Sequence, residues 1–254
     1  MIVFSCGYKP TNKSKIKRIV LYGLLSLFFY ILAPSNTNAQ QRMSADVTSQ
    51  QVYNKKKLRS ERQIFYTSNG KLVVHYTYPH EYWMTTNSLG EASVYEPSVN
   101  EVTIMTDKNV SLMSEVFMLF LTPNYTDLNL TKMGFILKES KREGNRVVKT
   151  IEPTSIEDKA FSKAIVVSEG KRPLYSAFYD NGGKVVKKTY FSHYVDLPMV
   201  SFPTRVTQIA YGANGDSTIR KEEYKNIRTS DFPADAPFNY TIPANAKRVK
   251  PFGD

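Results

Sequence analysis

Residues 64–78 read IFYTSNGKLVVHYTY, and this stretch decides the fold class. Asn69-Gly70 between two runs of β-forming residues is the strongest short-range signal for a β-hairpin. The alternation of a strand over residues 72–78 divides the side chains between an apolar face (Leu72, Val74, Tyr76, Tyr78) and a mixed face (Val73, His75, Thr77). This division predicts an antiparallel sheet that covers apolar material on one side.

The same pattern continues to both sides of this hairpin. Turn residues at 181–183 and 212–215 separate further β-forming runs. Strands are predicted at 82–86, 92–95, 101–104, 135–138, 146–152, 162–168, 174–179, 185–194, 204–210 and 217–226. About ten to twelve strands at this spacing, with one or two helices, predict a mainly β (α+β) protein built on one curved antiparallel sheet.

Two segments have a helical rather than a strand pattern. In residues 110–121, the apolar positions Val110, Met113, Phe117 and Phe120 recur at helical spacing, and Pro123 ends the run. Leu112, Val116 and Leu119 widen the apolar arc, so this helix is expected to be buried against the sheet. A short amphipathic helix is also predicted near residues 44–57.

The N-terminus has the pattern of a secretory signal peptide. Residues 1–18 carry five basic residues and no acidic one, the apolar run 19–33 follows, and Ala39 ends a stretch of small and polar residues. The apolar run is short for a membrane-spanning helix, which needs roughly 20 residues. We expect residues 1–39 to be removed on export and residues 40–254 to form one periplasmic domain. An uncleaved N-terminal anchor is the alternative.

Charge and cysteine content exclude several classes of function. The 254-residue chain carries a formal net charge of +11, but five positive charges belong to the signal, which leaves +6. That excess is too small to predict nucleic-acid binding. The single cysteine, Cys6, also lies in the signal, so the mature domain has no thiol for a disulfide or for cysteine-ligated zinc.

The sequence shows no pattern typical of an enzyme. It has no G-x-S-x-G elbow, no H-E-x-x-H helix and no phosphate-binding glycine loop. His75, His80 and His193 are predicted to be surface or second-layer residues rather than metal ligands. We therefore expect no enzymatic activity, no cofactor and no metal. Loss of some activity on mutation of His75 or His193 would be needed to revive an enzyme hypothesis.

Three stretches carry a resemblance to a known family. Residues 78–84 (YPHEYWM) are similar to a family strand start of the form x-Pro-x-x-Phe-x-Trp. Residues 92–103 (ASVYEPSVNEVT) are similar to its aromatic-x-Pro hairpin, and residues 238–249 (FNYTIPANAKRV) to its F-x-F-x-x-P-x-G-x-x-V ending. In this order, over roughly residues 45–249, the chain resembles the LolA-like family of periplasmic outer-membrane lipoprotein carriers.

The resemblance implies a half-open β-barrel with short helices that cover its concave face and enclose a hydrophobic cavity. It implies a monomeric carrier for lipoprotein acyl chains or other lipids. The implied partners are an inner-membrane protein that releases the cargo and an outer-membrane protein that accepts it. In that family an Arg before the strand proline holds the helical lid. Tyr78 occupies this place here, so the family's gating does not carry over.

A cavity lining and a filled core share one sequence signature, so the candidate residues have two interpretations. As ligand-binding residues of a hydrophobic cavity they are Tyr66, Val74, Tyr76, Met84, Tyr95, Ile104, Val116, Phe117 and Phe120. Ordinary core packing is the other interpretation. A second hypothesis for the whole protein is a non-catalytic envelope interaction or lipoprotein-sensing module on the same fold.

Overall fold

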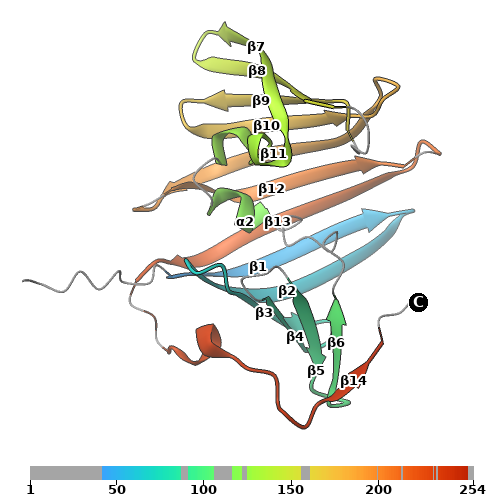
Figure 1. Ribbon diagram of the computed structural model, residues 1–254, viewed down its shortest axis with the longest axis vertical. Helices are drawn as coiled ribbons and strands as arrows, with labels where there is room; N and C mark the ends of the chain where they lie inside the picture. Colours follow the sequence, from blue (N-terminus) through green and yellow to red (C-terminus); the bar gives the residue numbers. More distant parts are fainter. Residues whose placement is uncertain are drawn as a thin grey trace, which may run out of the picture. The chain divides into compact units, whose positions relative to one another are not determined.

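One β-sheet of 14 strands organises the computed structural model of the chain (Figure 1). The structure describes residues 42–86, 91–105, 116–121, 125–155, 161–198, 200–212, 214–230, 232 and 234–250, without the side chain of Met118. The predicted signal peptide and the first part of the predicted helix 110–121 lie outside these residues. The strand order is β14-β6-β5-β4-β3-β2-β1-β13-β12-β11-β10-β9-β8-β7.

The sheet consists of two antiparallel meanders that meet in its middle. The first contains β1 (Arg42–Tyr53), β2 (Lys56–Thr67), β3 (Leu72–Tyr78), β4 (Tyr82–Thr86), β5 (Ala92–Glu96) and β6 (Glu101–Met105). The second contains β7 (Phe135–Glu143), β8 (Arg146–Pro153), β9 (Lys163–Glu169), β10 (Arg172–Tyr179), β11 (Val185–Asp196), β12 (Ser201–Tyr211) and β13 (Ser217–Arg228). β1 pairs with β13 and so joins them.

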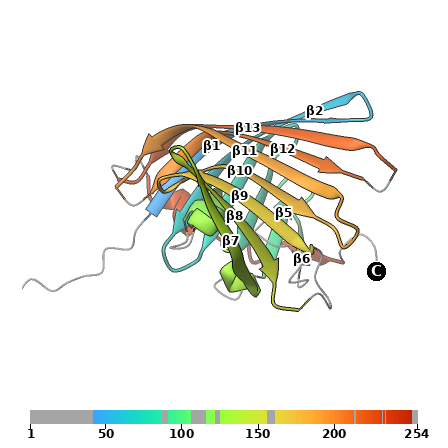
Figure 2. The same cartoon turned by 90° about the horizontal axis from the view of Figure 1, so that it is seen from above.

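The short strand β14 (Lys247–Val249) adds in parallel to β6, and every other strand pair is antiparallel. Successive strands rotate relative to one another, and the sheet twists and curls without closing (Figure 2). The predictions of a mainly β chain, a curved antiparallel sheet and the hairpins at Asn69-Gly70 and 181–183 are confirmed.

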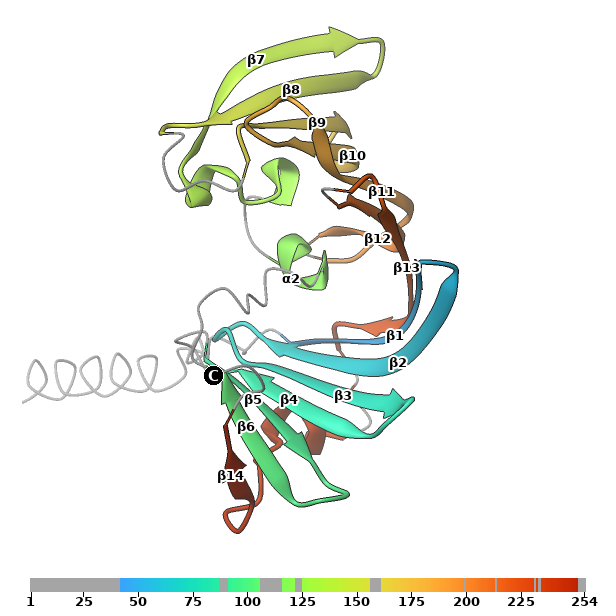
Figure 3. The same ribbon diagram turned by 90° about the vertical axis from the view of Figure 1, so that its right-hand side faces the viewer.

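β6 lies near one edge of the sheet and β7 forms the other edge. We call the connection between these two strands the crossing segment, and its described part lies over one face of the sheet. This segment includes the helix α2 (Val116–Phe120) and the 3-10 helices η2 (Tyr125–Asp127) and η3 (Thr131–Met133). Figure 3 shows α2 on the concave side of the curled sheet. We call this the inner face.

The predicted amphipathic helix near residues 44–57 is wrong, because these residues form β1 and the start of β2. Met43, Ala45, Val47 and Ser49 are buried at every second position, which is the period of a strand. The alternation is weak in the sequence because two of the buried residues, Ala45 and Ser49, are small or polar. The lysines at 55–57 belong to the β1–β2 turn and the beginning of β2, with Asn54 and Lys55 at positive φ.

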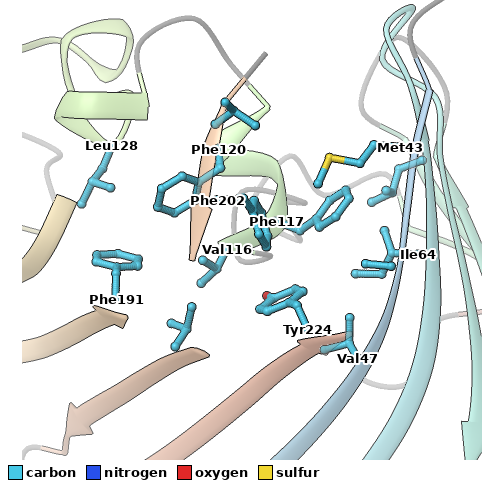
Figure 4. Packing of buried hydrophobic residues seen from close by; sticks show 14 of the residues in the cluster. Met43, Val47, Ile64, Val116, Phe117, Phe120, Leu128, Phe191, Phe202 and Tyr224 are labelled. Carbon is cyan, nitrogen blue, oxygen red and sulfur yellow. The ribbon is translucent and has the colours of Figure 1, made fainter. Parts of the chain in front are cut away.

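The main hydrophobic core lies between the inner face and the crossing segment (Figure 4). Strands from both meanders contribute to it, and α2 supplies Val116, Phe117 and Phe120. Its buried members are Met43, Ala45, Val47, Ile64, Leu72, Val74, Val116, Phe117, Phe120, Leu128, Leu130, Phe135, Ile151, Ala164, Val166, Phe191, Val200, Phe202, Val206 and Tyr224. One core therefore spans the seam between the two meanders.

The C-terminal segment covers part of the opposite, outer face. Phe238, in the 3-10 helix η4 (Ala236–Asn239), packs edge-on against Phe65 with ring centroids 5.3 Å apart. The Trp83 ring lies between two stacked rings, with centroid distances of 3.8 Å to His75 and 3.9 Å to Tyr240. Both faces of β2–β5 are therefore covered, which explains why Val73 on the mixed face is fully buried.

We expect Tyr240→Ala to loosen this C-terminal segment. Partial burial, with Tyr95 and Glu81 nearby, raises the pKa of the Tyr240 phenol to about 12. Losing the ring should cost about 1–2 kcal/mol of stability, because it removes an aromatic stack and apolar burial. Amide hydrogen exchange in residues 247–249 should then accelerate, whereas Tyr78→Ala, at a half-exposed side chain, should leave it unchanged. Equal exchange in both variants would contradict the expectation.

Candidate ligand-binding face

Strand register shows which predicted cavity residues share the inner face. Directly opposed residues of antiparallel strands lie on one face of a sheet. Tyr66 is opposite Met43, Val74 is opposite Ile64, and Met84 is opposite Val74. Tyr76 belongs to the same face as Val74 because it is two residues further along β3. Val74 is fully buried, and the other three are partly buried against the core.

The helix residues Val116, Phe117 and Phe120 pack against this face, and each is at most 1% exposed. Phe117 contacts Phe202 at a centroid distance of 5.6 Å and Tyr224 at 6.3 Å. Phe120 contacts Phe191 at 5.5 Å and Phe202 at 5.6 Å. The two phenylalanines of α2 thus fill the space over β11, β12 and β13.

Tyr95 and Ile104 do not line the same space as the other seven candidates. Tyr95 is opposite Trp83, and Ile104 is opposite Ser93, which places both on the outer face. Tyr95 is buried there, and its hydroxyl donates a hydrogen bond to Asn100 Oδ1 at 3.1 Å. Ile104 lines a separate outer-face pocket of about 530 Å³ beside Tyr240 and Ile242. Alternation in the sequence separates the two faces of each strand. It does not show which of the two is the inner face of the sheet.

Several aromatic residues of the inner-face cluster were missed as candidates. Phe191, Phe202 and Tyr224 are buried and surround α2, and they come from the second meander. Their strands were predicted or partly predicted, but nothing local in the sequence shows that the β1–β13 pairing brings them beside Val47. The long-range pairing of Val47 with Tyr224 is what completes the face.

An open pocket of about 660 Å³ leads to this cluster at one end of the second meander. Tyr125, Tyr194, Leu197 and Val200 belong both to the pocket wall and to the hydrophobic core or its margin. Behind them, Phe120 lies 5.7 Å from Tyr125 and 6.4 Å from Tyr194 between ring centroids. The remaining wall consists of Glu169, Gly170, Lys171, Arg172, Leu174, Asp196 and Ser201.

The rim of this pocket is polar and well ordered by hydrogen bonds. Arg172 binds both carboxylate oxygens of Asp196 at 2.7 and 2.8 Å and donates to Ser201 Oγ at 2.8 Å. Hydrogen bonds from Ser201 and Arg172 hold the pKa of Asp196 below its usual value. The Tyr194 hydroxyl donates to the Pro173 carbonyl, and burial raises the pKa of this phenol. The pocket therefore has an apolar back wall and a charged rim.

A group of buried charges lies further along the same face. Arg62 and Glu222, with side chains 0% and 2% exposed, form an ion pair at 2.8 Å that passes over β1. Arg220 also binds Glu222 at 2.5 Å, and the Tyr224 hydroxyl donates to the second oxygen at 2.9 Å. Burial alone would raise the pKa of Glu222, but the two guanidinium groups and these hydrogen bonds lower it. Glu222 is therefore ionised at neutral pH.

The described residues contain no cluster of three or more His, Cys, Asp or Glu side chains that could hold a metal ion. Of the predicted surface histidines, His75 is stacked on Trp83 and bonded to Glu81 at 2.9 Å. His193 contacts Ser192 and Arg205. Within the part of the chain that the structure describes, no helix is long and apolar enough to cross a membrane.

An open, curled sheet with a crossing segment on its apolar inner face defines a class of single-sheet folds, and solved structures show which one. A LolA superfamily protein from Nitrosomonas europaea matches with a TM-score of 0.52 at 15% identity, over 77% of this chain and 89% of that one. A DUF1329 family protein from Desulfovibrio piger matches with a TM-score of 0.54 at 15% identity, over 79% and 90%.

A domain from Vibrio parahaemolyticus named for outer membrane lipoprotein sorting gives a TM-score of 0.54 at 14% identity, over 78% and 89%. The chain therefore has the LolA-like fold, which confirms the resemblance drawn from the sequence at the level of the fold. No family model matches the sequence, and no curated protein matches it.

Proposed function

We propose that this protein is a non-enzymatic carrier that binds acyl chains of lipoproteins or other lipids against the inner face of its sheet. The observation that carries the proposal is the continuity between the apolar cluster at α2 and the 660 Å³ pocket. Pockets of roughly 300–1,000 Å³ with apolar walls and a few polar groups are typical of small-molecule sites. The LolA-like fold supports the same class of ligand.

The binding step follows from the packing of α2. Phe117 and Phe120 occupy the apolar surface that an acyl chain would need, so a bound chain displaces these rings and extends into the pocket. Each methylene removed from water contributes about 0.8 kcal/mol, which allows an acyl chain of ordinary length to replace the buried phenylalanines. In this proposal the crossing segment is the helical cover of a half-open barrel.

The place of action is proposed from the N-terminal sequence and the fold together. Residues 1–39 direct export, and residues 40–254 act in the periplasm as a monomer. The carrier would take its cargo from an inner-membrane releasing protein and deliver it to an outer-membrane accepting protein. Tyr78 precedes the proline where the family has Arg, and its side chain is half exposed, so it supports no equivalent lid contact.

The experiment for the carrier function is capture of lipid by the mature domain. Native mass spectrometry of protein purified from its host should show bound lipid or a lipopeptide. A fluorescent fatty acid should bind in vitro, and a pull-down that instead gave one stable protein partner without added lipopeptide would favour the interaction-module hypothesis. Absence of both lipid and captured lipopeptide would contradict the carrier function.

We expect Leu197→Asp to weaken fatty-acid binding at least tenfold. This side chain lines the pocket and packs against the core, so a carboxylate there would have to be desolvated beside the bound chain. Val99→Asp is the matched control, because Val99 is 55% exposed in the β5–β6 turn. Titration of the fluorescent fatty acid measures both variants. Equal affinities of Leu197→Asp and Val99→Asp for the fatty acid would contradict a role of the pocket in acyl-chain binding.

A further inference from the structure

The charges at the far end of the inner face point to the head group of the ligand. We propose that Arg220 and Lys187 bind the anionic head group, a phosphate or carboxylate, of a single-chain amphiphile whose acyl chain lies on the apolar cluster. This inference rests on the proposed function and specifies its substrate class.

Both cations lie on the inner face at the same distance from the apolar cluster. Along β13, Tyr224, Glu222 and Arg220 alternate onto the inner face, as their pairing with Val47, Ser49 and Gln51 of β1 requires. Along β11, Phe191 and Lys187 share this face in the same way, opposite Val206 and Ala210. Each cation is four residues from a buried aromatic ring, roughly 14 Å at about 3.4 Å per residue.

The two cations come from β11 and β13, the strands on either side of β12. Ala210, which faces Lys187, and Gln208, which faces Thr189 and Arg220, are the β12 residues between them. Burial and the nearby positive charge of Arg220 lower the pKa of Lys187, while Glu222 raises it. The ammonium and the guanidinium therefore interact electrostatically.

The local charge balance favours an anion. Arg62, Arg220 and Lys187 bring three cationic groups together around Glu222, whose carboxylate bonds both guanidinium groups. Arg62 and Glu222 are completely enclosed, whereas the Arg220 side chain is 29% exposed and Lys187 is partly exposed. Buried and half-buried charges are stable when they are compensated. A bound phosphate or carboxylate would compensate the excess at the two accessible cations.

A row of polar side chains on the inner face crosses the strands of both cations and extends to β10, next to the strand of Lys187. Ser176, Thr189, Gln208 and Arg220 form one row across β10, β11, β12 and β13. The Ser176 hydroxyl is buried and has no hydrogen-bond partner among the described residues. A buried hydroxyl without a partner is costly, and an acceptor oxygen of a ligand would satisfy it.

The test compares two lipids that share an oleoyl glycerol body and differ by one phosphate: oleoyl lysophosphatidate and mono-oleoylglycerol. We expect Lys187→Gln to weaken lysophosphatidate binding about tenfold and to change mono-oleoylglycerol binding less than twofold. Lys187→Arg should restore most of the affinity. Lys188→Gln is the matched control, because Lys188 lies on the outer face over the Tyr211 ring at 5.6 Å. Arg220→Gln should act like Lys187→Gln, with folding checked by circular dichroism.

The other outcomes would contradict the head-group site, the carrier function or the identity of the bound anion. If both lipids bind and Lys187→Gln affects them equally, or if Lys188→Gln has the same effect, the head-group site is wrong and the carrier function stands. If neither lipid binds but a lipopeptide does, the head-group site is wrong and the carrier function stands. If no lipid and no lipopeptide binds, both proposals fail. If inorganic phosphate alone binds as tightly as lysophosphatidate, the site holds a free ion rather than a lipid head group.

Discussion

Replacing Glu222 with Gln is expected to lower the free energy of unfolding by about 3–5 kcal/mol, because it leaves Arg62 buried without its countercharge. The neighbouring residue provides a matched control. Glu223 lies on the outer face, 38% exposed, and pairs with Lys225 and Arg205. Exposed pairs contribute about 0–1 kcal/mol, so Glu223→Gln should have little effect. Urea unfolding measures the loss of unfolding free energy in both variants. Equal losses would contradict the description of Glu222 as the countercharge of a buried Arg62.

Glu222→Gln should also change how the free energy of unfolding depends on pH, because the pKa of Glu222 is lowered in the folded protein. The folded protein holds this carboxyl ionised more strongly than the unfolded chain does. Its contribution to stability is therefore complete above the unfolded pKa, about 4.3, and is lost as the pH falls through the lower folded value. Acid unfolding of Glu222→Gln should lack this component. Parallel pH profiles of the variant and the wild type would contradict the assignment.

Truncating the phenylalanines of α2 should separate core packing from ligand binding. Phe117→Ala and Phe120→Ala each remove a side chain that is at most 1% exposed, and such changes cost about 3–5 kcal/mol. In the carrier proposal, the same change also vacates the acyl-chain surface. We therefore expect tighter binding of a fluorescent fatty acid per folded molecule, by a factor of about three to ten.

The control for these variants is Val99→Ala, at a side chain that is 55% exposed in the β5–β6 turn. It should change neither the free energy of unfolding nor fatty-acid binding. Urea unfolding and fluorescence titration on the same samples give both quantities. Destabilised phenylalanine variants with unchanged or weaker binding would mean that these rings are ordinary core residues and that the ligand surface lies elsewhere.

Local signals in the sequence predicted much of the sheet. Asn69-Gly70 and the alternation of residues 72–78 gave the β2–β3 hairpin, since turn chemistry and strand period are properties of a few adjacent residues. Residues 44–57 were predicted as a helix because their strongly apolar residues are few. The buried positions Ala45 and Ser49 are small or polar, so the period of a strand did not stand out. Of the predicted helix 110–121, the structure describes a helix at Val116–Phe120, and residues 106–115 lie outside the described part.

The candidate site was predicted less completely than the fold. Seven of the nine candidates meet at the inner face because they lie on neighbouring strands or on α2. Tyr95 and Ile104 were assigned to the inner face because strands that are covered on both faces carry apolar residues on both. Here Phe238 and Tyr240 belong to the segment that covers the outer face. The Arg62–Glu222 pair, 160 residues apart in the sequence, depends on strand pairing that no local pattern encodes.

The pairing of β1 with β13 has a consequence for the order in which the chain can fold. Strands β2–β6 can pair as successive hairpins as soon as each is available, but the second edge of β1 finds its partner only when residues near 217–228 are present. Contacts of such large sequence separation make folding slow. Until then β1 offers an unpaired edge and an uncovered apolar face. The edge and the apolar face of β1 are therefore open to aggregation until almost the whole chain is available for folding.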